Sequence, residues 1–368
     1  MPPLTRGVLL LTGLAVVTRS RAQGPPDPWR PRTMPAFGAS YAPDIGLLLG
    51  AGIIHTRYGF HALPPTTRAL AEAQYATAAR SYRVNVAAEF RPWGPPTTFN
   101  VAFRASGLEL IRFYGIGNET DGSRADSAYR VREKQIQLAP SVTVPVAARV
   151  RLTTGPLLEY TRTSADPGSL LATTGPYYGA GAFGQLGLHV ILDFDTRDSP
   201  TAPARGVHLT AGGQWHPALW HVVSPFGSCS AEAATYFSAD DPASVTLALR
   251  AGGAAVAGTV PFQEFVYVGG ETTVRGYAEQ RFTGRRGAYA NVELRLAAGR
   301  LPFGDVGLFG LADGGRVWVP GEVSDRWHAA AGGGVWLAWQ HRRANILSIA
   351  AARSPERTAA YLRAGFLF

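Results

Sequence analysis

The sequence predicts an all-β protein, a transmembrane antiparallel up-and-down β-barrel. Three observations favour this class. Apolar and polar residues alternate in segment after segment, 43 glycines and 27 prolines punctuate the chain, and only 17% of its residues are charged. Mean hydropathy is −0.01, as expected when lipid-facing and lumen-facing residues alternate and cancel. A soluble β-sandwich of 368 residues is the alternative that composition alone leaves open.

The N-terminal residues predict export. Arg6 precedes a short apolar run, and Ser20 and Ala22 follow it as a small-residue cleavage site. We therefore expect residues 1–22 to be a signal peptide and the mature chain to begin at Gln23. The apolar run is about half as long as a membrane-spanning helix, and no other window approaches that length. An exported chain of this kind that resides in a membrane is expected to cross it as a barrel.

The domain organisation is predicted to be simple. Residues 23–44 are rich in proline and are expected to form an extended segment ahead of the fold. Residues 45–368 are expected to form the barrel, with no second domain, because no stretch shows helix periodicity with caps. About a dozen strands are secure from the pattern, and residues 68–92 fit either one strand or two.

The alternation also predicts which residues share a face. Over residues 288–296, apolar and polar side chains occupy opposite faces of one strand. The apolar face comprises Val292, Leu294 and Leu296, and the polar face comprises Asn291, Glu293 and Arg295. Short turns alternate with long connections such as 163–180 and 258–286, which favours a membrane barrel over a sandwich.

Several other function classes are not supported by the sequence. The formal charge is +9, but the arginines are scattered through strands, so we expect no nucleic-acid partner. No catalytic motif is present and the histidines lack metal-ligand spacing, so we expect neither enzyme activity nor a cofactor. Asp193, Asp195 and Asp198 could suggest calcium, but the glycine and terminal glutamate of an EF-hand are missing. We therefore expect no metal site, and a tight turn with its own ion pairs there.

The stretch VYVGGETTVRGYAEQRFTGRRGAYANVELR, residues 266–295, is the most unusual part of the chain. It predicts a strand, a long glycine-rich loop and a second strand. No lysine followed by serine or threonine stands at P-loop spacing, and no helix follows, so a nucleotide site is not expected. The loop contains Arg275, and its function depends on which groups that arginine meets.

Further motifs accompany this loop in a defined order. They are Arg112-Phe-Tyr-Gly-Ile-Gly-Asn-Glu-Thr120; a turn with Asp195, Arg197, Asp198, Pro200, Pro203 and Gly206; the loop residues Gly269, Gly270, Val274, Arg275, Gly276 and Tyr277; Asn291-x-Glu293-Leu-Arg295; Phe309-x-x-x-Asp313-x-Gly315-x-Val317-Trp318; and Phe368. Together they resemble the bacterial surface antigen superfamily, which includes BamA-like and TamA-like assembly factors and two-partner secretion transporters. The resemblance covers residues 45–368.

The resemblance implies a barrel of sixteen antiparallel strands with a lid loop folded into its lumen. In this family the loop arginine pairs with acids on the inner wall, so Arg275 is expected to meet Glu293 and Asp313. The Asp195–Gly206 motif is implied to be a periplasmic turn. Phe366 and Phe368 are implied to serve as a C-terminal assembly signal, and they continue an apolar face that begins at Leu362 and Ala364.

The resemblance also implies a function. The family acts in protein insertion into, or translocation across, the outer membrane of Gram-negative-type bacteria. Outer-membrane lipid, the assembly machinery during biogenesis and an unknown client or partner protein are the implied partners. Typical assembly factors carry periplasmic repeat domains, and the residues after Gln23 are too few to supply one. A passive structural barrel or pore, or a membrane platform for a separate partner, therefore remains the alternative.

Overall fold

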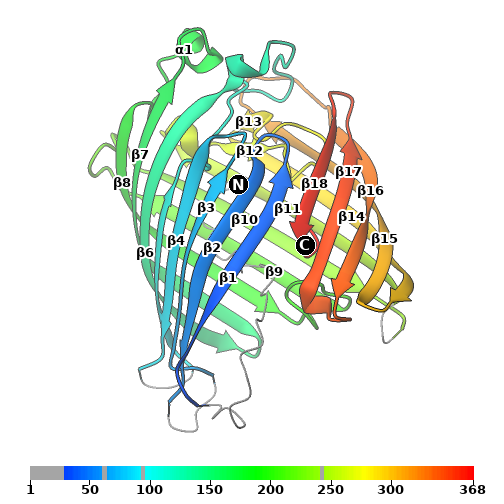
Figure 1. The fold of residues 1–368 in the computed structure, drawn as a ribbon. Helices are drawn as coiled ribbons and strands as arrows, with labels where there is room; N and C mark the ends of the chain where they lie inside the picture. The colour runs from blue at the N-terminus through cyan, green and yellow to red at the C-terminus, as the bar shows by residue number, and fades with distance from the viewer. Residues whose placement is uncertain (1–28, 60–63, 93–95, 241–243) are drawn as a thin grey trace.

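The computed structural model describes residues 29–59, 64–92, 96–240 and 244–368, so the signal peptide expected over residues 1–22 lies outside the described residues. Sixteen antiparallel strands form a closed barrel, which confirms the expected fold class (Figure 1). The barrel strands are β1 (Arg32–Ala42), β2 (Gly46–Arg57), β3 (Thr67–Ala76), β4 (Ser81–Phe90), β5 (Thr98–Ser106), β6 (Val131–Ala147), β7 (Val150–Ala165), β8 (Ala182–Asp195), β9 (Gly206–His216), β10 (Phe226–Phe237), β11 (Val245–Gly258), β14 (Arg286–Leu301), β15 (Gly304–Trp318), β16 (His328–Trp339), β17 (Ile346–Arg353) and β18 (Thr358–Ala364).

The helical elements are all short and lie in connections between strands. They are α1 (Leu170–Thr174), η1 (Asp126–Tyr129), η2 (Phe262–Glu264) and η3 (Arg343–Asn345). Among the described residues, no helix is long and apolar enough to cross a membrane.

The connection between β11 and β14, residues 259–285, is the lid loop. It contains two short strands, β12 (Val266–Val268) and β13 (Phe282–Gly284), which pair with each other and not with the barrel wall. Every residue of both strands is buried. The lid loop therefore folds inside the barrel, as the resemblance implied (Figure 1).

Side-chain burial is inverted relative to a soluble protein. On β14 the apolar side chains are exposed and the polar side chains are buried, as for Leu294 at 44% exposure and Glu293 at 1%. The same inversion holds on β8, where Leu188 is exposed and Gln185 is buried. The predicted alternation is thus confirmed, and it puts an apolar outer wall around a polar lumen, as a membrane requires.

The start of the barrel differs from the expected boundary at residue 45. The first strand, β1, already begins at Arg32, inside the segment expected to be an extension. It pairs with β2 along its whole length but with β18 only where Tyr41 meets Leu362. Among the residues that the structure describes, Pro35 therefore has a neighbouring strand on one side only, and proline is tolerated at such an edge. The prolines of residues 23–44, of which only Pro35 lies in β1, disguised this strand in the sequence.

Residues 68–92, which fitted either one strand or two, belong to two strands. They are β3 and β4, which pair with each other from Thr67 opposite Phe90 to Ala76 opposite Ser81. The tight turn between them, residues 77–80, lacks an obvious proline or glycine signal, and Arg80 adopts a positive φ of 48° there.

The junction of β1 and β18, called the seam below, is the weakest in the barrel wall. A single register pair joins the two strands, whereas β17 and β18 pair continuously from Leu347 opposite Ala364 to Arg353 opposite Thr358. The strands on one side of the seam, β17 and β18, are also short. Strand β18 has 7 residues and β17 has 8, against 17 in β6 and 16 in β14.

The two ends of the barrel carry different connections. The long connections 107–130 and 166–181 and the lid loop lie at one end, called the loop end below, together with α1 (Figure 1). Strand β1 begins and β18 ends at the opposite end. In outer-membrane barrels the long loops are extracellular and the short turns are periplasmic, which orients the loop end outward.

Candidate functional site

Arg275 of the lid loop lies between two carboxylates of the inner wall. Its Nε and Nη2 donate to the two oxygens of Asp313 at 2.7 and 2.8 Å, and its Nη1 donates to Glu293 Oε1 at 2.5 Å. Its backbone N–H donates to Asp313 at 3.0 Å. All three residues are at most 4% exposed. Because guanidinium is a planar fork with five donors, it can hold both acids at once.

Two further polar residues of β14 extend this ion cluster. Arg295 donates to Glu293 Oε2 at 2.7 and 2.9 Å, and Asn291 donates to Asp313 Oδ1 at 2.8 Å. Two arginines thus face two carboxylates, and the buried charges balance. Since an unpaired buried charge is costly, this balance makes the position of the lid loop depend on its arginine.

The remaining lid-loop motif residues fix the path of the backbone. Gly269, Gly270 and Gly276 have φ values of 114°, 90° and 88°, a region that disfavours side chains. At Gly276 a Cβ would lie 3.1 Å from the backbone nitrogen of Ser354. Val274 and Tyr277 are buried in an apolar cluster that also contains Val268, Phe282 and Val317.

The lid loop is hydrogen-bonded to one side of the seam, the β17–β18 hairpin. The Gly276 N–H donates to the Tyr361 hydroxyl at 2.8 Å, and the Gly276 carbonyl accepts from Ser354 Oγ at 2.8 Å. The Tyr277 carbonyl accepts from Arg357 Nη2 at 2.8 Å.

Asp44 connects the lid loop to the other side of the seam. It lies in the β1–β2 turn and accepts from Arg357 at 2.7 and 3.1 Å and from the Glu279 N–H at 2.8 Å, and it forms an ion pair with Arg112 at 2.9 Å. Burial alone would raise the pKa of Asp44, but bonding to Arg357 and the charges of Arg357 and Arg112 hold that pKa below its ordinary value of 3.8. The Asp44–Arg357 pair, called the seam clasp below, spans the two hairpins that flank the seam.

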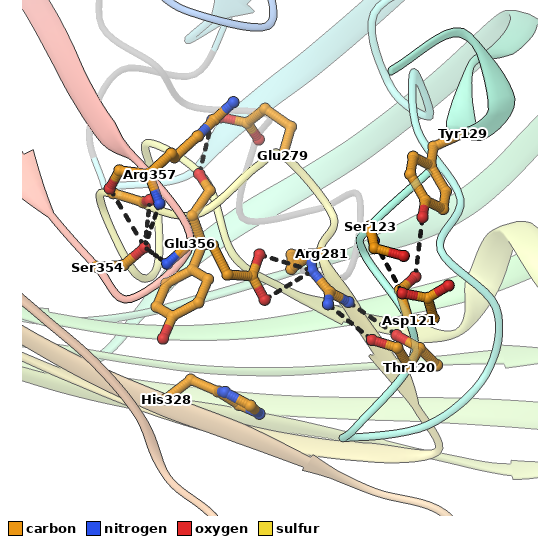
Figure 2. A network of polar contacts seen from close by, with 12 residues as sticks. Thr120, Asp121, Ser123, Tyr129, Glu279, Arg281, His328, Ser354, Glu356 and Arg357 are labelled. Atoms are coloured by element: carbon orange, nitrogen blue, oxygen red, sulfur yellow. Dashed lines mark hydrogen bonds and ion pairs between the residues drawn. The ribbon is translucent and has the colours of Figure 1, made fainter. Parts of the chain in front are cut away.

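Arg281 is a second anchor of the lid loop, and Figure 2 shows it between Glu356 and Thr120. Its Nε donates to the Glu356 carboxylate at 2.8 and 3.1 Å, and its Nη atoms donate to Thr120 Oγ1 and the Thr120 carbonyl at 2.8 and 2.7 Å. The guanidinium also lies 4.9 Å from the ring centre of Tyr114. No motif in the sequence marks this arginine.

Residues of the Arg112–Thr120 motif complete the closure of the loop end. Gln280 of the lid loop accepts from the N–H groups of Ile111 and Arg112 at 3.0 Å each. Asn118 is fully buried, and its Oδ1 accepts from the Val317 N–H at 3.0 Å. The motif thus contacts both the lid loop and β15. In the sequence it was recognisable only as one of the motifs of the family, and these contacts were not predicted.

The Asp195–Gly206 turn lies at the opposite end, and its acids are bound by groups of the turn itself and, at Asp198, also by Arg343 at 3.1 Å. Asp195 accepts from Arg197 at 2.7 Å, and Asp198 accepts from the N–H groups of Ala204 and Arg205 at 2.9 and 3.3 Å. Among the described residues no group of three side chains is placed to hold a metal ion. The other turn residues are Pro200, Pro203, whose carbonyl accepts from Arg295 at 3.3 Å, and Gly206, with φ of 106°.

Phe366 and Phe368 do not continue the apolar face of β18. The strand ends at Ala364, and Gly365 turns the chain with a φ of 84°. The Phe366 ring then lies 3.9 Å from the Arg295 guanidinium, and the Phe368 carbonyl accepts from Arg295 at 2.6 Å. The expectation of a continued alternation is therefore wrong, because a cation–π contact with the ion cluster draws both rings inward.

Replacing Arg281 with alanine is expected to loosen connection 107–130 without opening the barrel. The variant loses two charge-assisted contacts, which together contribute about 2 kcal/mol to local stability. Limited proteolysis of outer-membrane preparations should show faster cleavage in 107–130. Arg124→Ala, an exposed arginine of the same connection, is the matched control and should be cleaved at the wild-type rate; equal rates for both variants would exclude Arg281 as an anchor.

These features define the class of protein: a membrane-spanning barrel with an internal lid loop held by an arginine. The model of the Omp85 superfamily domain matches residues 67–347, and the chain belongs to this superfamily. The resemblance noted in the sequence is thereby confirmed. Barrels of this superfamily function in protein insertion into, or translocation across, the outer membrane, and the fold implies the outer membrane of a Gram-negative bacterium.

Solved structures show the same fold at low sequence identity. BamA from Haemophilus ducreyi lacking POTRA domains 1–3 aligns with a TM-score of 0.64 and 14% identity, over 90% of this chain and 70% of that one. CdiB from Escherichia coli aligns with a TM-score of 0.61 and 14% identity, over 92% and 63%. CdiB from Acinetobacter baumannii gives 0.53 and 12%, over 90% and 59%. A comparison with curated protein sequences gives no match.

Proposed function

We propose that this barrel inserts a protein client into the outer membrane, or translocates one across it, by opening at the seam. The observation that carries the proposal is the single register pair between β1 and β18, Tyr41 opposite Leu362. Breaking so few hydrogen bonds costs far less than separating any pair of strands with a continuous ladder.

The free edge of β1 provides a place for the client. From Thr33 to Ser40 the strand is paired with β2 and, within the described part of the chain, not with β18. An edge strand presents unpaired N–H and C=O groups, which are a template for an added strand. We propose that an extended strand of an outer-membrane protein pairs there before it leaves into the bilayer.

The lid loop argues against the alternative of an open passive pore. Its buried cluster around Arg275 lies across the lumen and is held on both sides of the seam. We therefore propose that the resting barrel is closed to ions and that lid and seam move together. A role as a membrane platform for a separate partner is compatible with the same barrel and differs from insertion only in lacking seam opening.

A disulfide across the seam tests the proposal. In a Cys229→Ser background, Tyr41→Cys with Leu362→Cys joins the register pair of the seam. With the protein in proteoliposomes and a urea-unfolded outer-membrane barrel protein as client, oxidation should reduce client insertion to the background of empty liposomes, and reduction should restore it. We expect at least a tenfold loss, because the locked edge cannot accept a strand.

The matched control places a disulfide between strands that are already continuous. Phe37→Cys with Ala51→Cys joins a register pair of β1 and β2, and its oxidation should leave insertion unchanged. Undiminished insertion through the locked seam would mean that clients do not pass there.

We also propose the remaining steps of biogenesis. Residues 1–22 are removed to give a mature chain beginning at Gln23, and Phe366 and Phe368 are read by the outer-membrane assembly machinery before they fold inward. The barrel then acts without catalysis, cofactor or metal, on a client whose identity its own residues do not specify.

A further inference from the structure

We propose that the outer wall of β6 and β7 binds the phosphates of a lipid headgroup in the outer leaflet. The site is a basic patch of Arg132 and Lys134 on β6 and Arg162 on β7, all exposed. Their neighbours in the strands, Glu133 and Thr161, are buried in the lumen, so the three cations point out of the barrel.

The register brings like charges together in this patch. Lys134 lies directly opposite Arg162, and Arg132 lies opposite Ser164. Like charges opposite each other in antiparallel strands destabilise the pair, with Cβ atoms about 5 Å apart. Arg132 pairs with Asp166, but within the described part of the chain neither Lys134 nor Arg162 has a carboxylate partner. An anion from outside the protein would relieve this repulsion.

The layers below the patch fix its depth in the membrane. Moving along the strands from the patch toward the middle of the membrane, the next pair of lipid-facing residues is Ile136 opposite Tyr160. The pair after it is Leu138 opposite Leu158. Tyr160 stacks on exposed Trp220 with ring centres 5.9 Å apart. Because tyrosine and tryptophan lie at the membrane–water interface, the apolar band ends at this layer. Lys134 and Arg162 are one outward-facing pair nearer the loop end, about 7 Å along the strands, where lipid phosphates lie, and Arg132 is one pair beyond them.

The direction of the strands assigns the patch to the outer leaflet. Strand β6 begins after connection 107–130 and β7 ends before 166–181, both at the loop end (Figure 1). Three cations on two strands can contact more than one phosphate, and arginine binds a phosphate through two parallel hydrogen bonds. A lipid with two phosphates on a sugar headgroup therefore fits the patch better than a lipid with one.

The first test uses the wild-type protein alone. Native mass spectrometry of the detergent-solubilised barrel measures binding of a bisphosphorylated glucosamine lipid, its fully dephosphorylated form and phosphatidylglycerol. We expect the bisphosphorylated lipid to bind at least about tenfold more tightly than either of the others, since each nearby cation contributes a several-fold gain. Inorganic phosphate at millimolar concentration should not displace it. Equal binding of all three lipids, or displacement by free phosphate, would overturn the proposal.

The second test removes the opposed cations. Lys134→Gln with Arg162→Gln should lower affinity for the bisphosphorylated lipid about tenfold or more, whereas Lys134→Arg with Arg162→Lys should retain it. Arg286→Gln with Arg300→Gln removes the same charge from exposed positions on β14 and should bind as wild type. Heat-modifiable gel mobility verifies that each barrel is folded. An undiminished affinity in the first variant, or an equal loss in the β14 control, would refute a site at β6 and β7.

Discussion

Replacement of Arg275 with alanine is expected to free the lid loop from the inner wall while the barrel stays closed. The variant leaves Asp313 buried without its counter-charge and leaves Glu293 with Arg295 alone. Removing one partner of a buried ionic cluster typically costs about 3 to 5 kcal/mol. The strand ladder does not depend on this loop, so heat-modifiable mobility should persist.

The released lid loop should be visible in two measurements. Protease added to whole cells should cleave within residues 259–285, and the barrel in planar bilayers should conduct more than wild type. Arg275→Lys should restore both only partly, because an ammonium cannot fork between two acids. Arg285→Ala is the matched control, since the side chain of this partly exposed arginine of the same loop donates only to the Gly258 carbonyl among the described residues. Wild-type proteolysis and conductance in Arg275→Ala would show that the loop is anchored elsewhere.

Replacement of Asp44 with alanine is expected to open the seam at the loop end. The variant leaves Arg357 and Arg112 without their shared carboxylate and removes the acceptor of the Glu279 N–H. We expect a local cost of about 3 kcal/mol, comparable to breaking other buried pairs. Spin labels at Tyr41→Cys and Leu362→Cys, with Cys229→Ser, should report a longer and broader distance.

Asp126→Ala is the control for this variant, because Asp126 also pairs with Arg112, at 3.5 Å, but is 80% exposed. An exposed pair contributes little, so the seam distance should not change. If Asp44→Ala also keeps the wild-type distance, the seam clasp does not hold the seam.

The seam clasp should also respond to acid. The pKa of Asp44 is lower in the folded protein than its ordinary value of 3.8, so the carboxylate stabilises the fold above that pH. The contribution is lost as pH falls through the lower, folded pKa, when the carboxyl takes up a proton. The spin-label distance should therefore be constant from neutral pH to about 4 and lengthen below that range. In Asp44→Ala this acid transition should be absent.

The strands were predictable from the sequence wherever alternation is strict. On β14, Asn291, Glu293 and Arg295 alternate with aliphatic residues, and a pleated strand must put them on one face. The proline content of residues 23–44 hid the first strand, because proline disfavours a paired strand but is tolerated at an edge. Likewise Gly365 ended β18 before Phe366, and alternation alone gives no sign of such a turn.

The candidate site was predictable only in part. The pairing of Arg275 with Glu293 and Asp313 was predicted from the family motifs. Periodicity alone predicts which face of the strand Glu293 occupies, and it does not identify the partner of Glu293. Arg281, Gln280 and Asp44 lie in connections without periodicity, where contacts join residues 75 to 235 positions apart. No local pattern encodes such distant pairs, so these anchors required the three-dimensional structure.

The short strands beside the seam have a consequence for the surrounding lipid. With 7 residues at about 3.4 Å each and a tilt of about 40°, β18 spans only about 18 Å along the membrane normal, whereas the apolar band of such barrels is about 25 Å tall. Lipids touching this part of the wall must compress or expose their chains to water. The hydrophobic mismatch thus falls on the flank where β1 has its free edge, and a strand leaving there enters a bilayer that the protein has already thinned.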